Sequence, residues 1–453
     1  MSSTFAPMIF SDLEIISPIL KAIKEQGYVA PTPIQAKAIP KLLEGNDLLG
    51  SAQTGTGKTA AFTIPLLQQL YVSKSKKKKK GRRVVKALII SPTRELALQI
   101  NENISNYAKY TGAKSVVIFG GISQRKQTSA LQNGADILVA TPGRLLDLIG
   151  QGYIRLNHIN YFVLDEADQM LDMGFIHDIN KIIAKLPEKR QSLFFSATMP
   201  KAIIELSNQI LKNPKRIRIA PKQTTAERVT QSLYYVSKAD KASLLKHLID
   251  ENIGVSILVF SRTKHGADKI VKSLDKSNIK SEAIHGNKSQ NTRQKTLQRF
   301  KKSKFSVLVA TDIAARGIDV TKLSLVINYD LPNVAETYVH RIGRTGRARE
   351  SGEAITFCSS GEKGYLDDIQ KLINQKIPVI SDHPFHNQKE ADAPEGKKHK
   401  KPENRSKNKS SKSKNARKKP TVLKGKFKKK PGKKSNFKGS FKRKKRNEKK
   451  SKR

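Results

Sequence analysis

One glycine-rich segment has the residue types and spacing to bind the phosphates of a nucleotide. It follows an apolar run at 47–52 and leads into an amphipathic run from Lys58 onward. Its glycines let backbone N–H groups turn toward phosphate oxygens, its lysine would reach the β- and γ-phosphates, and the next threonine would ligate Mg²⁺. Such segments can also be plain tight turns. Here the strand pattern before the segment and the helix pattern after it favour a nucleotide site. Ala52 departs from the usual pattern, which has glycine at this position. The residues are Ala52, Gln53, Thr54, Gly55, Thr56, Gly57, Lys58 and Thr59.

A cluster of carboxylates lies further along the chain. Asp165, Glu166 and Asp168 directly follow an apolar run at 161–164. The carboxyl ends of parallel strands border the crevice in which ligands bind. There, one acid can hold Mg²⁺ through water and the next can orient an attacking water. An acidic cluster alone is often a solvated turn or a helix cap, but together with the phosphate-binding segment it favours a catalytic role.

Two arginines near the end of the folded part have a helical spacing. Arg341 and Arg344 are three residues apart, so they would share one face of a helical turn. Two guanidinium groups on one face could clamp a γ-phosphate and stabilise the charge of its transition state. The alternative is a basic surface patch or a salt-bridged helix.

Short apolar runs that alternate with amphipathic segments would position these residues. Apolar, β-branched and aromatic runs of this kind are typical of parallel strands that are covered on both faces. Two successive series predict two tandem α/β domains, with a polar break near 219–231. The first series lies at 47–52, 85–92, 115–121, 136–142, 160–168 and 191–200, and the second at 256–263, 281–286, 305–312, 323–332 and 353–360.

The composition indicates the compartment in which the protein works and the kind of partner that it binds. The 453 residues include 87 Lys and Arg against 38 Asp and Glu, a net charge of +49, with a single cysteine and no tryptophan. One cysteine excludes an internal disulfide framework and predicts a reducing, cytoplasmic setting. No apolar stretch is long enough to span a membrane, and the first residues lack the pattern of a secretory signal. The charge predicts a polyanionic partner.

Much of that charge lies in the last residues. From Lys397 onward the sequence contains 29 Lys and Arg and only two acidic residues, so +27 of the net charge of +49 lies there. With almost no aliphatic residues, this tail is predicted to be disordered. Phe427, Phe437 and Phe441 alternate with lysines, a pattern that suits base stacking and phosphate contact, although a merely solubilising polycation is the alternative. A second basic run at 74–83 is predicted to be an exposed loop.

Taken together, the motifs resemble those of the DEAD-box ATP-dependent RNA helicases, and 170–179 with 25–35 resemble the bacterial RhlE type. The resemblance covers the chain except the tail. Its motifs occur in the family's order: AQTGTGKT (52–59), PTRELA (92–97), GG (120–121), TPGR (141–144), DEAD (165–168), SAT (196–198), ATDIAARGID (310–319) and HRIGRTGR (340–347).

The resemblance implies a role for individual residues. The segment 8–36, with Phe10, Gly27, Thr32, Pro33 and Gln35, would read adenine, so the nucleotide is expected to be ATP. Catalytic roles fall to Lys58, Glu166, Arg341 and Arg344, Mg²⁺ binding to Thr59 and Asp165, and ribose contact to Asp319. Asp168, Ser196, Thr198 and His340 would couple hydrolysis to domain closure. RNA would contact Thr93, Arg94, Gly121, Thr141, Arg144, Arg262, Thr263, Gly286, Gln290, Arg293, Thr311 and Asp312.

Together these expectations define one mechanism, to which there are two alternatives. An ATP-binding domain (1–220), a linker (221–228), a second RecA-like domain (229–385) and a basic RNA-binding tail (386–453) would hydrolyse ATP on closure around RNA and unwind short duplexes. Glycines, hydroxyls and arginines suit backbone contacts, so little sequence preference is expected. Ribosomal particles or RNA-decay machinery are candidate partners, and no membrane is involved. The alternatives are an ATP-independent RNA-annealing protein and a DNA-directed helicase.

Overall fold

The computed structural model describes residues 8–53, 55–75, 83–219, 229–315, 323–346 and 352–392. By its internal contacts the chain falls into one unit at 1–398 and another at 399–453. Thr54, Asp319, residues 76–82 and the tail from residue 393 onward lie outside the described residues. The predictions made for them, and for the domain boundaries, therefore stay predictions.

The first half of the chain forms a seven-stranded sheet in which every strand pair is parallel. Its order is β3-β4-β2-β5-β6-β1-β7. The strands are β1 (Leu48–Ser51), β2 (Ala87–Ile90), β3 (Ser115–Ile118), β4 (Ile137–Ala140), β5 (Tyr161–Leu164), β6 (Gln191–Ser196) and β7 (Lys215–Arg218).

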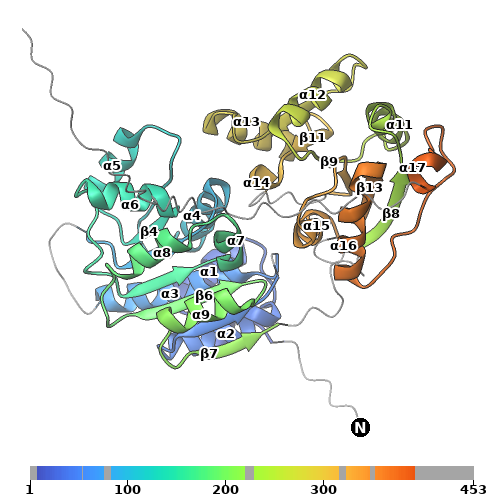
Figure 1. The fold of residues 1–453 in the computed structure, drawn as a ribbon. Coiled ribbons are helices and arrows are strands. Elements are labelled where there is room, and N and C mark those ends of the chain that lie inside the picture. Colours follow the sequence, from blue (N-terminus) through green and yellow to red (C-terminus); the bar gives the residue numbers. More distant parts are fainter. Residues whose placement is uncertain are drawn as a thin grey trace, which may run out of the picture. The chain divides into compact units, whose positions relative to one another are not determined.

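Helices cover both faces of this sheet (Figure 1). Alternate strand residues enter different cores: Ala87 and Ile89 pack with α1–α4, while Leu88 and Ile90 pack with α6–α9. This is the two-faced burial that continuous apolar runs predict. The helices are η1 (Phe10–Leu13), α1 (Ser17–Glu25), α2 (Pro33–Leu43), α3 (Lys58–Ser75), α4 (Arg94–Tyr107), α5 (Gln124–Gln132), α6 (Pro142–Gly150), α7 (Ala167–Asp172), α8 (Ile176–Ile183) and α9 (Lys201–Ile210).

The second half repeats the architecture with a six-stranded parallel sheet in the order β10-β11-β9-β12-β13-β8. Its strands are β8 (Val229–Tyr235), β9 (Ile257–Phe260), β10 (Ser281–Ile284), β11 (Val307–Ala310), β12 (Leu325–Asn328) and β13 (Gly352–Cys358). Its helices are α11 (Lys241–Glu251), α12 (Lys264–Asp275), α13 (Gln290–Lys301), α14 (Asp312–Ala315), α15 (Ala335–Ile342), η2 (Ser360–Glu362), α16 (Lys363–Ile373) and α17 (Gln388–Asp392). Two tandem parallel-sheet α/β domains are therefore confirmed.

The strand order decides which loops can meet. In a parallel sheet, the loops that follow the strands all leave from one edge. In the first sheet β5, β6 and β1 are neighbours, so the loops that carry the acidic cluster, Ser196–Thr198 and the glycine-rich segment converge. In the other half of the sheet β3, β4 and β2 are neighbours, and the loops that follow them carry Gly121, Thr141 and Arg94. The fold thus separates the two predicted sites along one edge.

Candidate active site and nucleic-acid interface

The glycine-rich segment connects β1 to the start of α3, as the sequence predicts. Gly55 and Gly57 have φ of 84° and 93°, which is the left-handed region that side chains disfavour. A Cβ atom at Gly57 would lie 2.4 Å from Gln35 Nε2, so close packing also requires glycine there. Ala52 is buried, and its N–H donates to the carbonyl of Ser196 on the neighbouring strand. The turn geometry therefore fits a phosphate-binding loop.

Lys58 and Glu166 form a buried ion pair at the start of α3. Lys58 Nζ lies 2.8 Å from Glu166 Oε1, with about 5% of each side chain exposed, and it donates to the Ala52 carbonyl at 2.9 Å. Burial lowers the pKa of Lys58, but the nearby carboxylates of Glu166 and Asp165 outweigh it and leave that pKa above its usual value. The ammonium is thus a fixed positive charge beneath the phosphate loop.

The three carboxylates of the acidic cluster have different surroundings. Burial raises the pKa of Glu166, but Lys58 outweighs this and holds it below its ordinary value. Burial, together with the charge of Glu166, raises the pKa of Asp165 to about 7. Asp165 Oδ1 is buried without a hydrogen-bond partner among the described residues. A buried carboxylate oxygen that lacks a donor fits a Mg²⁺ site, since hard cations prefer oxygen ligands.

Asp168 ties the acidic cluster to the loop after β6. Its Oδ2 accepts hydrogen bonds from the N–H groups of Ala197 and Thr198 and from Thr198 Oγ1, at 2.9–3.1 Å. The Asp168 N–H donates to Ser196 Oγ, which in turn donates to the Thr198 carbonyl. Asp168 and Ser196 are buried, whereas Thr198 is exposed. They form a closed network, so a movement of either loop must involve the other.

Gln35 joins the predicted adenine-reading segment to the phosphate loop. Its Oε1 accepts from the Thr32 N–H at 2.9 Å, and its Nε2 donates to the Gly57 carbonyl at 3.2 Å. Phe10 is buried in the core, where its ring stacks on that of Tyr28 with centroids 6.1 Å apart. The stacking of Phe10 on adenine stays a prediction.

The predicted RNA contacts of the first domain lie at the ends of β2, β3 and β4. Thr93 caps α4 by accepting from the Leu96 N–H. Thr141 directly precedes α6. Gly121 has φ of 82°, and a Cβ atom there would overlap the guanidinium of Arg94. Arg144 has a buried Nη1 without a partner among the described residues. Thus the N-termini of two helices and two guanidinium groups share this part of the sheet edge.

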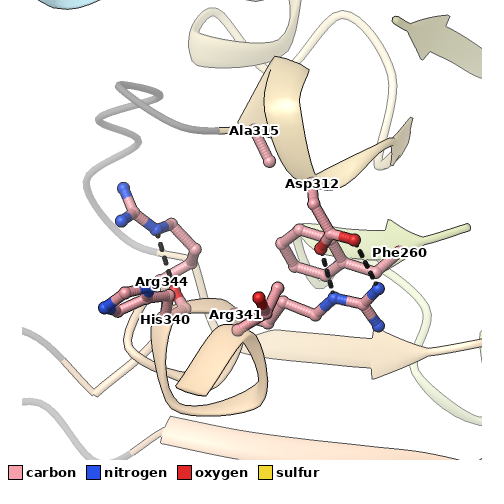
Figure 2. A pocket seen from close by; sticks show the side chains of 7 residues that line it. Phe260, Asp312, Ala315, His340, Arg341 and Arg344 are labelled. Carbon is pink, nitrogen blue, oxygen red and sulfur yellow. Dashed lines mark hydrogen bonds and ion pairs between the residues drawn. The ribbon is translucent and has the colours of Figure 1, made fainter. Parts of the chain in front are cut away.

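Arg341 and Arg344 occupy different environments on and just after α15 (Figure 2). The Arg341 guanidinium is 1% exposed, pairs with both carboxylate oxygens of Asp312 and donates to the Asp330 carbonyl at 2.6 Å. It lies over the ring of Phe260, 4.9 Å from the centroid. Arg344 Nε donates to the His340 carbonyl at 3.2 Å. The clamp predicted for both arginines stays a prediction, and within this domain Arg341 is already bound to Asp312.

The other predicted RNA residues of the second domain follow β9, β10 and β11, which are neighbours in the sheet. Thr263 caps α12 by accepting from the Gly266 N–H at 2.9 Å. Gln290 and Arg293 lie in the first turn of α13 and are largely buried, Thr311 precedes α14, Asp312 begins it, and Gly286 lies after β10. Arg262 is held by the Leu331 carbonyl and by Glu362.

Sequence reasoning missed several residues that support these sites. Gln169 donates to Glu166 Oε2 at 3.0 Å, and Asn328 accepts from Arg341 at 3.2 Å. Asp330 accepts from the Arg262 N–H, and Glu362 accepts from its guanidinium. Asn328 and Asp330 come at the end of an apolar run, a position that could have marked them. Glu362 has no such signal.

Comparison with known proteins gives a consistent result. A family model described as DEAD/DEAH box helicase matches residues 32–206, and one described as helicase conserved C-terminal domain matches residues 240–349. The DEAD-box ATP-dependent RNA helicase RhpA of Helicobacter pylori is 43% identical over 371 residues, which cover 82% of this chain and 74% of that protein. CshA of Streptococcus pneumoniae is 41% identical over 387 residues, covering 84% and 72%.

Solved structures with bound ligands are also similar. S. cerevisiae Dbp5 bound to RNA and ADP BeF3 has a TM-score of 0.71 and 30% identity, covering 83% of this chain and 96% of that one. Mss116p bound to ssRNA and AMP-PNP has a TM-score of 0.73 and 28% identity, covering 83% and 80%. Among the described residues, no helix is both long and apolar enough to cross a membrane.

Proposed function

Because the chain belongs to the DEAD-box ATP-dependent RNA helicases, we propose that it hydrolyses ATP when RNA is bound and uses closure of its two domains to unwind short RNA duplexes. The observation that carries the proposal is the buried Lys58–Glu166 pair beside Asp165 at the phosphate loop. Buried ionisable groups with shifted pKa values that gather beside a phosphate-binding loop favour a functional site over a purely structural ion pair.

Each of these groups has a separate task on ATP. The loop N–H groups and Lys58 bind the β- and γ-phosphates, and binding would shift Lys58 from Glu166 toward the phosphate oxygens. Glu166, whose lowered pKa keeps it ionised at neutral pH, orients the attacking water and accepts its proton. Asp165 and Thr59 would hold Mg²⁺, which supplies charge neutralisation at the phosphates.

The second domain would supply cations to the phosphates on closure. Arg344 is the more direct candidate for the γ-phosphate. Arg341 is bound to Asp312 on α14, so it reaches phosphate only if that pair opens, and until then it fixes α15 relative to α14. Asp319 would contact the ribose, and His340 would couple the domains. Neither domain would be a complete ATPase alone, which makes closure a step of induced fit.

RNA would bind along the strand edges that carry helix N-termini and arginines. Backbone N–H groups, hydroxyls and guanidinium groups contact phosphate and 2′-OH groups, which predicts little dependence on sequence and a preference for RNA. ATP and single-stranded RNA should each raise the affinity for the other, since both favour the closed state. We also infer an RhlE-like subtype, a cytoplasmic location, tail-dependent RNA affinity and a role in ribosome assembly or RNA turnover.

Unwinding of a labelled RNA duplex of about one helical turn, with and without ATP, tests this proposal. We expect strand separation that needs ATP, fails with an equally short DNA duplex and falls steeply as the duplex is lengthened. ATP-independent annealing without unwinding would favour the basic RNA-binding protein instead. Equal activity on the DNA duplex would favour the DNA-directed helicase.

A further inference from the structure

Arg262, one of the proposed RNA contacts, is held in an unusually well-defined position in the second domain. Its Nε and Nη2 donate to the Leu331 carbonyl at 3.2 and 2.9 Å, and Nη2 also donates to Glu362 Oε1 at 2.7 Å. Its guanidinium lies over the ring of Tyr365, 5.4 Å from the centroid. Its side chain nevertheless remains 34% exposed. One edge of the guanidinium is thus fixed to the domain through Nε and Nη2, while Nη1 makes no hydrogen bond within the described part of the chain.

Glu362 is the acceptor that fixes Arg262. It is 6% exposed and forms the end of η2, after β13. Its Oε1 also accepts from the Leu331 N–H at 3.2 Å, and its Oε2 accepts from Lys241 Nζ at 2.6 Å and from Ser359 Oγ at 2.8 Å. Glu362 therefore contacts α11, the segment after β12 and the residue before η2 at once. Such a connected set of charged hydrogen bonds resists rotation of the carboxylate.

Charge balance shows why this carboxylate tolerates burial. Lys241, which is 2% exposed, donates to the Tyr329 carbonyl at 2.7 Å and lies 3.6 Å from Asp330. Asp330 in turn accepts from the Arg262 N–H at 2.9 Å. Two cations thus face two carboxylates, so the cluster is internally neutral. Lys241 compensates the buried negative charge of this cluster. Of the two carboxylates, Glu362 contacts the Arg262 side chain, whereas Asp330 contacts the Arg262 backbone N–H.

We propose that Glu362 is a positioning residue for RNA binding, which orients the Arg262 guanidinium so that its exposed edge meets a backbone phosphate. This inference rests on the proposed function, because it assumes that Arg262 contacts RNA. Glu362 lies outside both spans that the family models match, at 32–206 and 240–349. A fixed guanidinium loses less conformational entropy when it binds phosphate than a freely rotating one, so the carboxylate should strengthen RNA binding.

If only net charge mattered, substitution of Glu362 would change the RNA affinity in the opposite direction, so the substitution tests the proposal. Removing a negative charge near an RNA site should tighten binding if the charge only repels phosphates. If Glu362 positions Arg262, Glu362→Gln should weaken binding instead. Lys241→Met is the matched control: charge counting predicts weaker binding, whereas the positioning role predicts a smaller loss than in Glu362→Gln, because the Leu331 N–H and Ser359 Oγ still hold the carboxylate that accepts from Arg262.

The experiment uses the full chain, fluorescent polyuridylate and a non-hydrolysable ATP analogue, and measures RNA affinity by anisotropy over a range of salt. We expect Glu362→Gln to raise the RNA Kd about five-fold, the effect of one hydrogen bond, and Lys241→Met to leave it within about two-fold. Arg262→Ala should also weaken binding and should lower the salt slope by about one, as loss of one phosphate contact does. In the Arg262→Ala background, Glu362→Gln should have no further effect.

Controls separate positioning from damage to the fold. Thermal unfolding shows whether each variant is folded at the assay temperature. Glu362→Asp keeps the charge but withdraws the oxygen from Arg262, so it should also weaken RNA binding. In steady-state ATPase assays, the KM for RNA should rise in Glu362→Gln while kcat at saturating RNA stays nearly constant.

Three outcomes would overturn the inference: tighter RNA binding by Glu362→Gln, equal weakening by Lys241→Met, or additive effects of Arg262→Ala and Glu362→Gln. Failure of the proposed function gives a different result, since the unmodified chain would then show no RNA-stimulated ATP hydrolysis at all.

Discussion

Lys58 and Glu166 form a buried ion pair in which Nζ and Oε1 are 2.8 Å apart, at the point where the phosphate loop meets the loop after β5. Without nucleotide each group satisfies the other. We propose that, when ATP binds, phosphate oxygens replace the carboxylate as the partner of Lys58 and Glu166 turns toward the attacking water. The ion pair would then hold both proposed catalytic groups charged and in place before the substrate arrives.

Replacing Lys58 with alanine should abolish ATP hydrolysis and destabilise the first domain. The substitution removes the cation at the phosphates and leaves Glu166 buried without its partner. We expect kcat to fall at least about 100-fold, as on loss of one transition-state donor. Steady-state hydrolysis and thermal unfolding measure the two effects. An unchanged melting temperature would contradict the structural part of this prediction.

Gly57→Ala should prevent nucleotide binding by a steric effect that can be separated from backbone strain. The new Cβ would meet Gln35 Nε2 at 2.4 Å, and φ is 93°. Gly112→Ala is the control, because φ there is 62° but no atom lies within 4 Å of the new Cβ. Binding of a fluorescent ATP analogue should be lost only in Gly57→Ala. Equal loss in both variants would show that the effect is general destabilisation.

Asp168→Asn should uncouple hydrolysis from unwinding. Asp168 Oδ2 accepts three hydrogen bonds from Ala197 and Thr198, and Oδ1 accepts one from the Gln169 N–H, so an amide would have to turn its NH₂ group toward one of these donors. Lys58 and Glu166 stay in place, so RNA-stimulated ATPase should remain within about ten-fold while duplex unwinding falls by more. Both activities are measured on the same preparation, and a proportional loss of both would argue against a coupling role.

Chemical labelling of the single cysteine should report unfolding of the second domain. Burial raises the pKa of Cys358 to about 12, so its thiol stays protonated and unreactive in the folded state. Iodoacetamide should therefore label it only after unfolding, and raising the pH from about 7 to about 9 should accelerate labelling of the unfolded chain but hardly that of the folded one. Rapid labelling without denaturant would contradict the burial of this thiol.

The sequence was sufficient for the fold and placed the glycine-rich segment and the acidic cluster at neighbouring loops, but it did not reveal the partners of the individual side chains. Apolar runs and the glycine-rich segment predict parallel strands and a phosphate loop, because those features are local. The spacing of Arg341 and Arg344 predicts a shared helical face. It could not reveal that Arg341 is buried against Asp312, since that contact joins residues 29 positions apart. Likewise, Glu362 meets Arg262 across 100 positions.

Steady-state ATP hydrolysis with and without single-stranded RNA, in the unmodified chain and in Glu166→Gln, tests the central claim most directly. Glu188→Gln is the control, because that glutamate is exposed and pairs with Lys212 at the surface. We predict strong stimulation by RNA in the unmodified chain and in Glu188→Gln, and loss of hydrolysis in Glu166→Gln. Hydrolysis that ignores RNA, or that persists in Glu166→Gln, would contradict the account.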